Sequence, residues 1–145
     1  MGKKITSVVF DTNIIISALL FRNDNLSFLR EYWRQKYVIP LVSKATAEEL
    51  IRVLSYPKFK LSRTEQDEIL SDYLPHTKII TSTSRQIEGL PLCRDVHDQK
   101  FIELAIVGRA SYLITGDSDL LDMKDELPVP VVTIKQWVSL LDINI

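Results

Sequence analysis

The chain contains few of the residues on which several common classes of functional site are built. Its 145 residues include a single cysteine, Cys93, which excludes an internal disulfide framework and a zinc site built from cysteines. It has only four glycines, and neither the glycine-rich loops of nucleotide-binding folds nor the serine-centred turn of α/β hydrolases occurs. Nucleotide-dependent and serine-nucleophile chemistries are therefore poor candidates.

Long apolar segments and a strong net charge are also missing. No apolar run approaches the roughly 20 residues that a helix needs to cross a bilayer. The first apolar run meets Asp11 too early to be the apolar region of a signal peptide, so we expect a cytoplasmic protein. The net charge of −1 and the pI of about 6.1 indicate no general attraction to nucleic acid, although a basic rim around an acidic site fits the same composition.

Short runs of β-branched and other apolar residues alternate with helical patterns along the chain. We expect strands at residues 5–10, 37–42, 77–81, 112–115 and 129–133. We expect helices at residues 13–21, at 26–36, at 44–54 with Ser43 as the N-cap, from a cap at Ser62 or Thr64 to about 74, from Asp95 or Asp98 to 108, briefly near 120 and around 137–141. A break at residues 22–25 and a polar connection at residues 82–94 separate some of these elements. The alternation predicts an α/β fold with three layers (α/β/α) and a mainly parallel central sheet of about five strands, with residues 1–145 forming one domain.

Two aspartates directly follow expected buried strands. Asp11 ends the first strand, and Asp117 follows the fourth. In open parallel sheets, ligands bind beyond the carboxyl ends of the strands, so both carboxylates are candidates for a site. Capping of the next helix explains Asp11 equally well, and Asn13 either orients the Asp11 carboxylate or caps that same helix.

Further acidic residues lie on expected helices. Asp98 shares a face with the apolar Phe101, Ile102 and Ala105, where a carboxylate is costly to bury unless it is paired or bound to a cation. The alternative for Asp98 is a place in the first helical turn, where the helix dipole favours negative charge. Asp95 is interpreted as a cap or a solvated neighbour.

Two further pairs of acidic residues, Glu48 with Glu49 and Asp117 with Asp119, lie close together in the sequence. Glu48 and Glu49 flank the apolar stripe of the helix at residues 44–54, and a solvated position explains either of them. In Thr115-Gly116-Asp117-Ser118-Asp119, one carboxylate can bind a ligand while the other caps the short turn that follows.

Several carboxylates that converge at one edge of a sheet repel one another and raise one another's pKa values. A hard divalent cation relieves this repulsion, and an all-oxygen set of ligands points to Mg²⁺ or Mn²⁺ rather than zinc. Such a cation acidifies a bound water and stabilises charge on a phosphodiester under in-line attack, so phosphodiester hydrolysis is the expected chemistry. His97, next to Asp98, suggests a general base, but a lone histidine in a polar loop is interpreted as solvated. Cys93 has no evident helper and is interpreted as a small buried or neutral residue.

Four segments, taken in order, resemble the acidic segments of PIN domains. They are V-V-F-D-T-N at residues 8–13, T-A-E-E-L-I-R-V-L at residues 46–54, C-R-D-V-H-D-Q-K-F-I-E-L-A at residues 93–105 and Y-L-I-T-G-D-S-D-L-L at residues 112–121. Each segment is weak alone, but four in this order and spacing are specific. The resemblance extends from about Ile5 to Leu141, and the most similar subgroup is that of VapC-type toxins of prokaryotic toxin–antitoxin systems.

The resemblance implies roles for particular residues. Four acids would be catalytic and hold the metal: Asp11, Glu49, Asp98 and Asp117. Supporting positions would be Thr12, Asn13, Thr115 and, as a fifth acid, Asp119. Glu49 is preferred to Glu48 because the glutamate of the family directly precedes a leucine, here Leu50. The central segment departs from the R-D-P-D-D-D-K-F pattern frequent in the subgroup, since Val96, His97 and Gln99 replace a proline and two acids.

The resemblance also implies an activity and partners. It implies an endoribonuclease that depends on Mg²⁺ or Mn²⁺, forms a homodimer or higher homo-oligomer, and binds an antitoxin protein. Candidate contacts to RNA are the basic residues Arg22, Lys44, Lys58, Lys60, Arg63, Arg94 and Lys100. Each of these is equally explained as a solvated surface charge.

Two other functions stay open at this point. A phosphatase that forms an aspartyl-phosphate would use Asp11, but such enzymes usually carry a second aspartate two residues later, where this chain has Asn13. A PIN scaffold without activity that binds RNA or protein is the other alternative, and the complete acidic quartet argues against it.

Overall fold

The computed structural model describes residues 6–21 and 26–143, and its centre is a five-stranded sheet in which every strand pair is parallel. The strand order is β3-β2-β1-β4-β5. The strands are β1 (Thr6–Phe10), β2 (Val38–Val42), β3 (Lys78–Ile79), β4 (Tyr112–Ile114) and β5 (Val131–Val132). The predicted α/β class, with a parallel sheet between helical layers, is confirmed.

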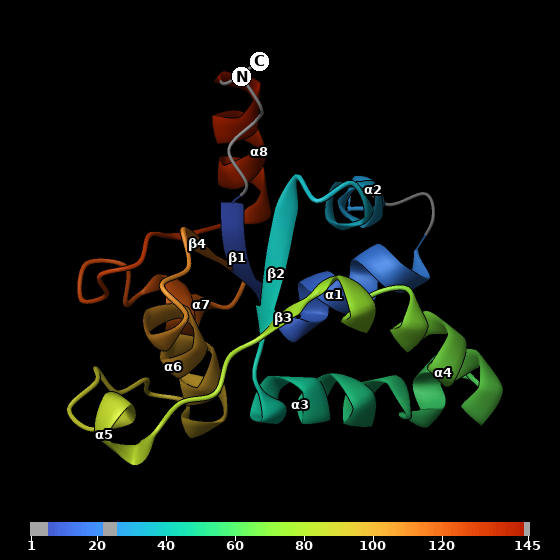
Figure 1. Ribbon diagram of the computed structural model, residues 1–145, viewed down its shortest axis with the longest axis horizontal. Helices are drawn as coiled ribbons and strands as arrows, with labels where there is room; N and C mark the ends of the chain where they lie inside the picture. Colours follow the sequence, from blue (N-terminus) through green and yellow to red (C-terminus); the bar gives the residue numbers. More distant parts are fainter. Residues whose placement is uncertain (1–5, 22–25, 144–145) are drawn as a thin grey trace.

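Helices cover both faces of this sheet (Figure 1). The α-helices are α1 (Thr12–Leu20), α2 (Phe28–Arg34), α3 (Lys44–Leu54), α4 (Arg63–Ser71), α5 (Ser84–Ile87), α6 (Gln99–Val107), α7 (Ser118–Leu121) and α8 (Ile134–Ile143). Single 3₁₀ turns are η1 (Pro57–Phe59), η2 (Leu74–His76) and η3 (Val96–Asp98). Within the described ranges, no helix has the length and apolar character needed to span a membrane.

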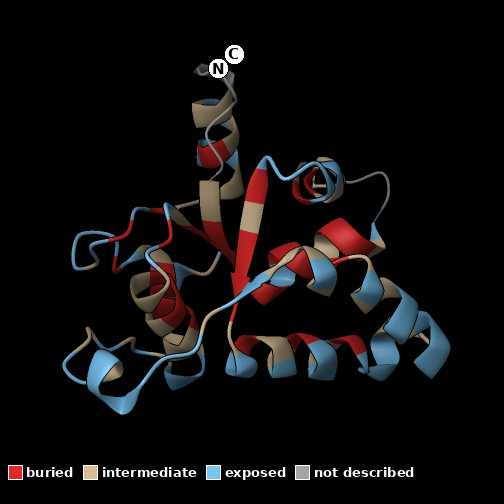
Figure 2. Cartoon of the chain, viewed as in Figure 1, coloured by how far each residue is buried: buried red, intermediate tan, exposed pale blue. Residues whose placement is uncertain are grey.

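Alternation along the strands divides the core into two clusters. In β1, Val8 and Phe10 face one cluster while Val9 faces the other. The first cluster contains residues of α1, α2, α3 and α8, and Phe10 packs there edge-to-face on Trp33 and Trp137. The second cluster contains residues of α6 and α7. The carboxyl-terminal part of β1 is therefore buried on both faces (Figure 2), which explains its apolar run Val8-Val9-Phe10.

Capping residues define where several helices begin. Ser43 accepts a hydrogen bond from the Thr46 amide at the start of α3, and the Ser43 amide donates one to the Thr46 hydroxyl, so this predicted cap is confirmed. Ser62, rather than Thr64, caps α4 in the same reciprocal way with Glu65.

Some predicted boundaries were wrong for identifiable reasons. The third and fifth strands are shorter than the predicted residues 77–81 and 129–133: β3 is a short exposed edge strand, and Pro130 lacks the amide needed to extend β5. The helix predicted to reach about residue 74 ends at Ser71, because Tyr73 turns inward and is fully buried.

The connection at residues 82–94 also contains a short helix, α5, capped by Thr83, which the prediction missed. Ile5, the predicted start of the first strand, and the predicted break at residues 22–25 lie outside the described residues.

Gly108, at the end of α6, lies close to β2 and provides a test of this packing. A Cβ atom there would stand 2.7 Å from Leu41 Cδ1 and 2.8 Å from the Leu104 carbonyl oxygen, whereas a Cβ on Gly116 would meet nothing within 4 Å. We expect Gly108→Ala to lower the free energy of unfolding by about 1–3 kcal/mol through overpacking. Chemical denaturation would measure this, with Gly116→Ala as the matched control; equal stability of the two variants would contradict the packing described.

Candidate functional site

The carboxyl ends of β1 and β4 lie side by side in the middle of the sheet. The chain leaves β1 toward β2 on one side and leaves β4 toward β5 on the other, so the strand order reverses between them. The Asp11 amide continues this pairing by donating to the Ile114 carbonyl at 3.0 Å. A crevice at such a reversal is where open α/β sheets bind ligands.

Asp11 is buried at this point and has two polar partners. Its Oδ2 accepts a hydrogen bond from the Thr115 hydroxyl at 2.8 Å, and its Oδ1 accepts a longer one of 3.4 Å from the Asn13 amide. The capping interpretation of Asp11 is therefore confirmed, and Asn13 contributes its backbone amide while its side chain is exposed. Burial raises the pKa of Asp11, the hydrogen bond from Thr115 opposes this shift, and the negative charges of Asp117 and Glu49 add to it.

Thr115 connects Asp11 to the acids that follow β4. Its fully buried hydroxyl donates to Asp11 and accepts from the Asp117 amide at 3.0 Å. Asp117 in turn caps α7 by accepting from the Asp119 amide at 2.8 Å through Oδ1. The turn after β4 thus fixes Asp117 beside Asp11 and leads directly into Asp119.

Asp98 lies where η3 gives way to α6. It occupies the N-cap position of α6, although its side chain makes no capping bond to the described backbone. Its Oδ2 is buried and has no hydrogen-bond partner among the described residues. Burial first, then the negative charge of Asp117, raises the pKa of Asp98 to about 7. A buried carboxylate oxygen without a donor is the kind of atom that a cation satisfies.

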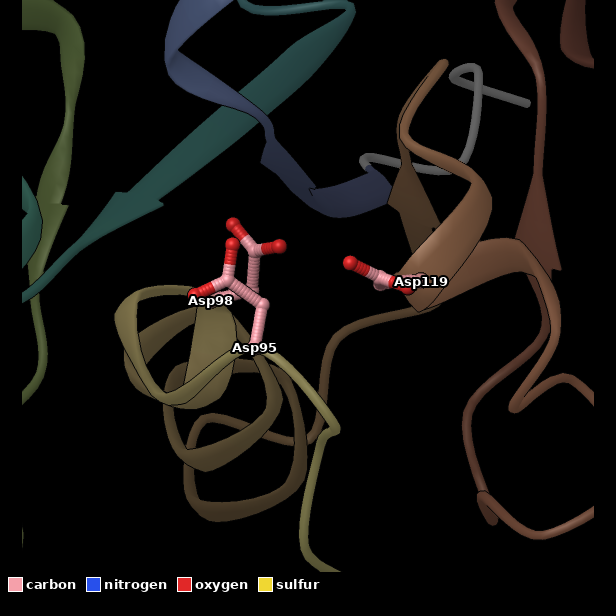
Figure 3. Close-up of side chains that lie close together, drawn as sticks. All are labelled: Asp95, Asp98 and Asp119. Atoms are coloured by element: carbon pink, nitrogen blue, oxygen red, sulfur yellow. The ribbon is translucent and has the colours of Figure 1, made fainter.

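Asp95 belongs to the same acidic group. Oxygens of Asp95, Asp98 and Asp119 lie within 4.8 Å of one another, and Figure 3 shows the three side chains directed toward a common space. Asp95 does cap η3, by accepting from the His97 amide at 2.9 Å, so its predicted capping role is correct but incomplete. The spacing of three residues allows Asp95 and Asp98 to lie close together, but it gives no sign of Asp119 beside them.

Glu49 approaches the site from α3 and is half-buried, whereas Glu48 is exposed. Its Oε2 accepts a hydrogen bond of 2.5 Å from the Thr12 hydroxyl, and its Oε1 lies 2.9 Å from Lys100 Nζ. Of the four predicted metal ligands, all of them described by the structure, only Asp98 belongs to the compact group with Asp95 and Asp119; the oxygens of Asp11, Glu49 and Asp117 lie outside it.

The residues that depart from the subgroup's pattern are accommodated by the loop before α6. The Gln99 side chain accepts from the Cys93 amide at 2.7 Å and donates to the Pro91 carbonyl at 3.0 Å. A carboxylate could accept the first bond but could not donate the second. Gln99 therefore attaches the loop at residues 91–93, just before Asp95, to the start of α6. Val96 and His97 are exposed.

The donor set of the centre fits a hard divalent cation. Oxygens of Asp95, Asp98 and Asp119 form the compact group, and Asp11 and Asp117 lie close enough for their negative charges to raise the pKa of Asp98. The raised pKa values of Asp11 and Asp98 reflect burial and repulsion between carboxylates, and a bound cation would relieve both. The unpartnered Oδ2 of Asp98 points to the same ligand class.

Comparison with known protein families identifies the family of this chain. Residues 7–119 match the family model described as the PIN domain, a span that includes every acid considered above. The chain belongs to the PIN-domain family. The resemblance deduced from the four acidic segments is thereby confirmed.

Individual proteins and solved structures are also similar to this chain. A protein of Methanocaldococcus jannaschii named as uncharacterized protein MJ1680 is 30% identical over 132 residues, covering 87% of this chain and 80% of the relative. The crystal structure of VapBC2 from Rickettsia felis bound to a DNA fragment from their promoter matches with a TM-score of 0.60 and 17% identity, covering 88% of this chain and 98% of the matched one. PAE2754 from Pyrobaculum aerophilum matches with a TM-score of 0.58 and 13% identity, covering 97% and 99%. At these identities the two structures support the fold.

The raised pKa of Asp98 in this PIN domain has a consequence for stability. Because its folded-state pKa is about 7 and the ordinary value is 3.8, the metal-free folded state retains a proton that the unfolded state loses. The stability contributed by protonated Asp98 is therefore fully present below pH 3.8 and declines as the pH rises toward 7. In EDTA, Asp98→Asn should raise the melting temperature at pH 8 and leave it nearly unchanged at pH 4.

Thermal denaturation at the two pH values would measure this difference. Asp125→Asn, at an exposed position after α7, is the control and should show no such pH dependence. If Asp98→Asn lowers the melting temperature at pH 8, the raised pKa of Asp98 is contradicted.

Proposed function

We propose that this PIN domain is a metal-dependent endoribonuclease that hydrolyses RNA phosphodiesters. The observation that carries the proposal is the convergence of Asp11, Asp98 and Asp117 at the sheet's reversal point, with a buried oxygen of Asp98 lacking a partner among the described residues. Membership of the PIN-domain family supports a nuclease, and the sequence resemblance supports RNA as its substrate.

The proposed roles follow from the contacts of each side chain. Asp11, Asp98 and Asp117 would hold Mg²⁺ or Mn²⁺, with Glu49 as the fourth acid at the edge of the centre. The bound cation would acidify a water molecule and offset negative charge on the phosphodiester. Thr115 orients Asp11 through its hydroxyl, and Thr12 does the same for Glu49. Asp95 and Asp119 provide further oxygens beside Asp98.

Basic residues near the centre support a polyanionic substrate. Arg94 pairs with Asp119 at 2.9 Å and Asp122 at 2.8 Å, and Lys100 pairs with Glu49. Among the other predicted RNA contacts, Lys44, Lys58, Lys60 and Arg63 are exposed, whereas Arg22 lies outside the described residues. We propose that RNA phosphates approach over Arg94 and Lys100, whose charges partly offset those of the acidic residues.

The biological setting is a further part of the proposal. The likeness in fold to a VapBC2 structure supports a role as the toxin of a toxin–antitoxin pair, with an antitoxin protein as partner. We further propose a single cytoplasmic domain that forms a homodimer or higher homo-oligomer. Ile79, on the edge strand β3, is 74% exposed, and an apolar side chain at an open sheet edge favours such association.

Replacing Asp11 with Asn tests the enzymatic proposal. The variant keeps the size of the buried side chain but removes its charge. We expect the rate of cleavage to fall by at least about 100-fold, which exceeds the usual effect of removing a residue that only hydrogen-bonds a metal ligand. Cleavage of a mixed RNA pool in Mg²⁺, Mn²⁺ or EDTA would measure this, with Glu48→Gln on the exposed side of α3 as the control.

The outcomes separate the alternative functions. The proposed mechanism is contradicted if RNA cleavage persists in EDTA, or if Asp11→Asn cleaves RNA at the rate of the unmodified protein. Binding of Mn²⁺ without cleavage of any RNA would favour a scaffold that only binds its partner. A covalent phosphate trapped on Asp11 would favour the aspartate-dependent phosphatase.

A further inference from the structure

Glu49 is bound on both carboxylate oxygens by side chains from two other elements. The Thr12 hydroxyl at the start of α1 donates to Oε2 at 2.5 Å, and the Lys100 ammonium in the first turn of α6 lies 2.9 Å from Oε1. These contacts join α1, α3 and α6 at one carboxylate. Glu49 is therefore restrained in position and partly neutralised by residues of the chain itself.

Lys100 is well suited to act as a fixed cation. Its side chain is 19% exposed, and that of Glu49 is 16% exposed, so water screens this pair less than a surface pair. The ammonium also donates to the His97 carbonyl and lies 5.5 Å from the centroid of the Phe101 ring. These additional contacts anchor the charge next to Asp98 in the chain and limit the positions that Glu49 can adopt.

Arg52 provides the contrast within the same site. Its Nη2 lies 3.8 Å from the same Oε1 of Glu49, but its side chain is 61% exposed and both residues belong to α3. Such a long, exposed pair on one helix contributes little. Arg52 and Lys100 therefore place the same charge near one oxygen, and only Lys100 connects that oxygen to the element that carries Asp98.

The carboxylate that Lys100 holds is close enough to influence the acidic centre. The negative charge of Glu49 contributes to the raised pKa of Asp11, after the larger effects of burial and of Asp117. A divalent cation at the centre would attract Glu49 toward itself, and Lys100 would have to release Oε1 before this oxygen could join it.

We propose that Lys100 is a positioning residue whose ammonium competes with the divalent cation for Glu49 and thereby holds this carboxylate at the edge of the acidic centre. The inference rests on the proposed function for the identity of that centre. It assigns Glu49 two alternative partners, Lys100 and the cation, and it makes the strength of cation binding depend on the Lys100 side chain.

Calorimetric titration of the full chain with Mn²⁺ tests the competition without using activity. Lys100→Met should bind Mn²⁺ about tenfold more tightly, because it removes a nearby positive charge and frees Glu49. Lys100→Arg keeps a cation beside Glu49 and should restore most of the original affinity. Arg52→Met, which also loses one positive charge, should change the affinity less than about twofold.

The Glu49→Gln variant distinguishes competition for Glu49 from a simple electrostatic effect of the Lys100 charge on the metal. If Lys100 acts through Glu49, the gain produced by Lys100→Met should shrink when Glu49 is also replaced by Gln. An equal gain in both backgrounds would mean that Lys100 acts only as a nearby charge and would overturn the proposal. Unchanged or weaker Mn²⁺ binding by Lys100→Met, or no Mn²⁺ binding by any variant, would overturn it as well.

RNA cleavage at saturating metal gives the complementary result. Lys100→Met should lower kcat about tenfold, because the metal binds well but Glu49 has moved. A raised KM with unchanged kcat would leave Lys100 with a contact to RNA phosphate alone and would contradict the positioning role. If the unmodified protein binds Mn²⁺ and cuts no RNA, the proposed ribonuclease fails while the titrations still decide the role of Lys100.

Discussion

The hydrogen bond from Thr115 to Asp11 joins the ends of the two strands between which the sheet reverses its order. It is buried and connects residues 104 positions apart in the chain. The same hydroxyl accepts from the Asp117 amide, so the position of Asp117 depends on that of Asp11. The pairing of β1 with β4 therefore determines the geometry of the acidic centre, and the helices that follow each strand begin from it.

Repulsion between carboxylates is the second constraint on this region. Asp98 has a raised pKa because it is partly buried close to Asp117, Asp95 and Asp11. The fold tolerates this cost because the side chains are held by elements stabilised elsewhere, in the two apolar clusters on either side of the sheet. A site that is unfavourable when empty and favourable with a cation is typical of metal-dependent catalysis, in which local strain is offset by the remainder of the fold.

The sequence predicted what depends on local patterns. The apolar run before Asp11 predicted β1, and Ser43 predicted the start of α3 and hence the helix that carries Glu49. It did not predict that Asp95 lies with Asp98 and Asp119, or that Lys100 pairs with Glu49. Both depend on how α6 docks on the sheet and on the direction of side chains in a short 3₁₀ turn, and spacing alone does not determine either.

The net charge of −1 conceals how the cations near the centre are arranged. Arg94 is already paired with Asp119 and Asp122, and Lys100 with Glu49, so neither is a free charge awaiting a phosphate. An RNA strand that binds here must replace these internal partners as well as displace its own counterions. Cation binding would favour this exchange, because a metal that draws acidic side chains to itself releases their basic partners toward the substrate. If metal and RNA both bind as proposed, their binding is coupled through these two ion-paired residues, and each increases the affinity for the other.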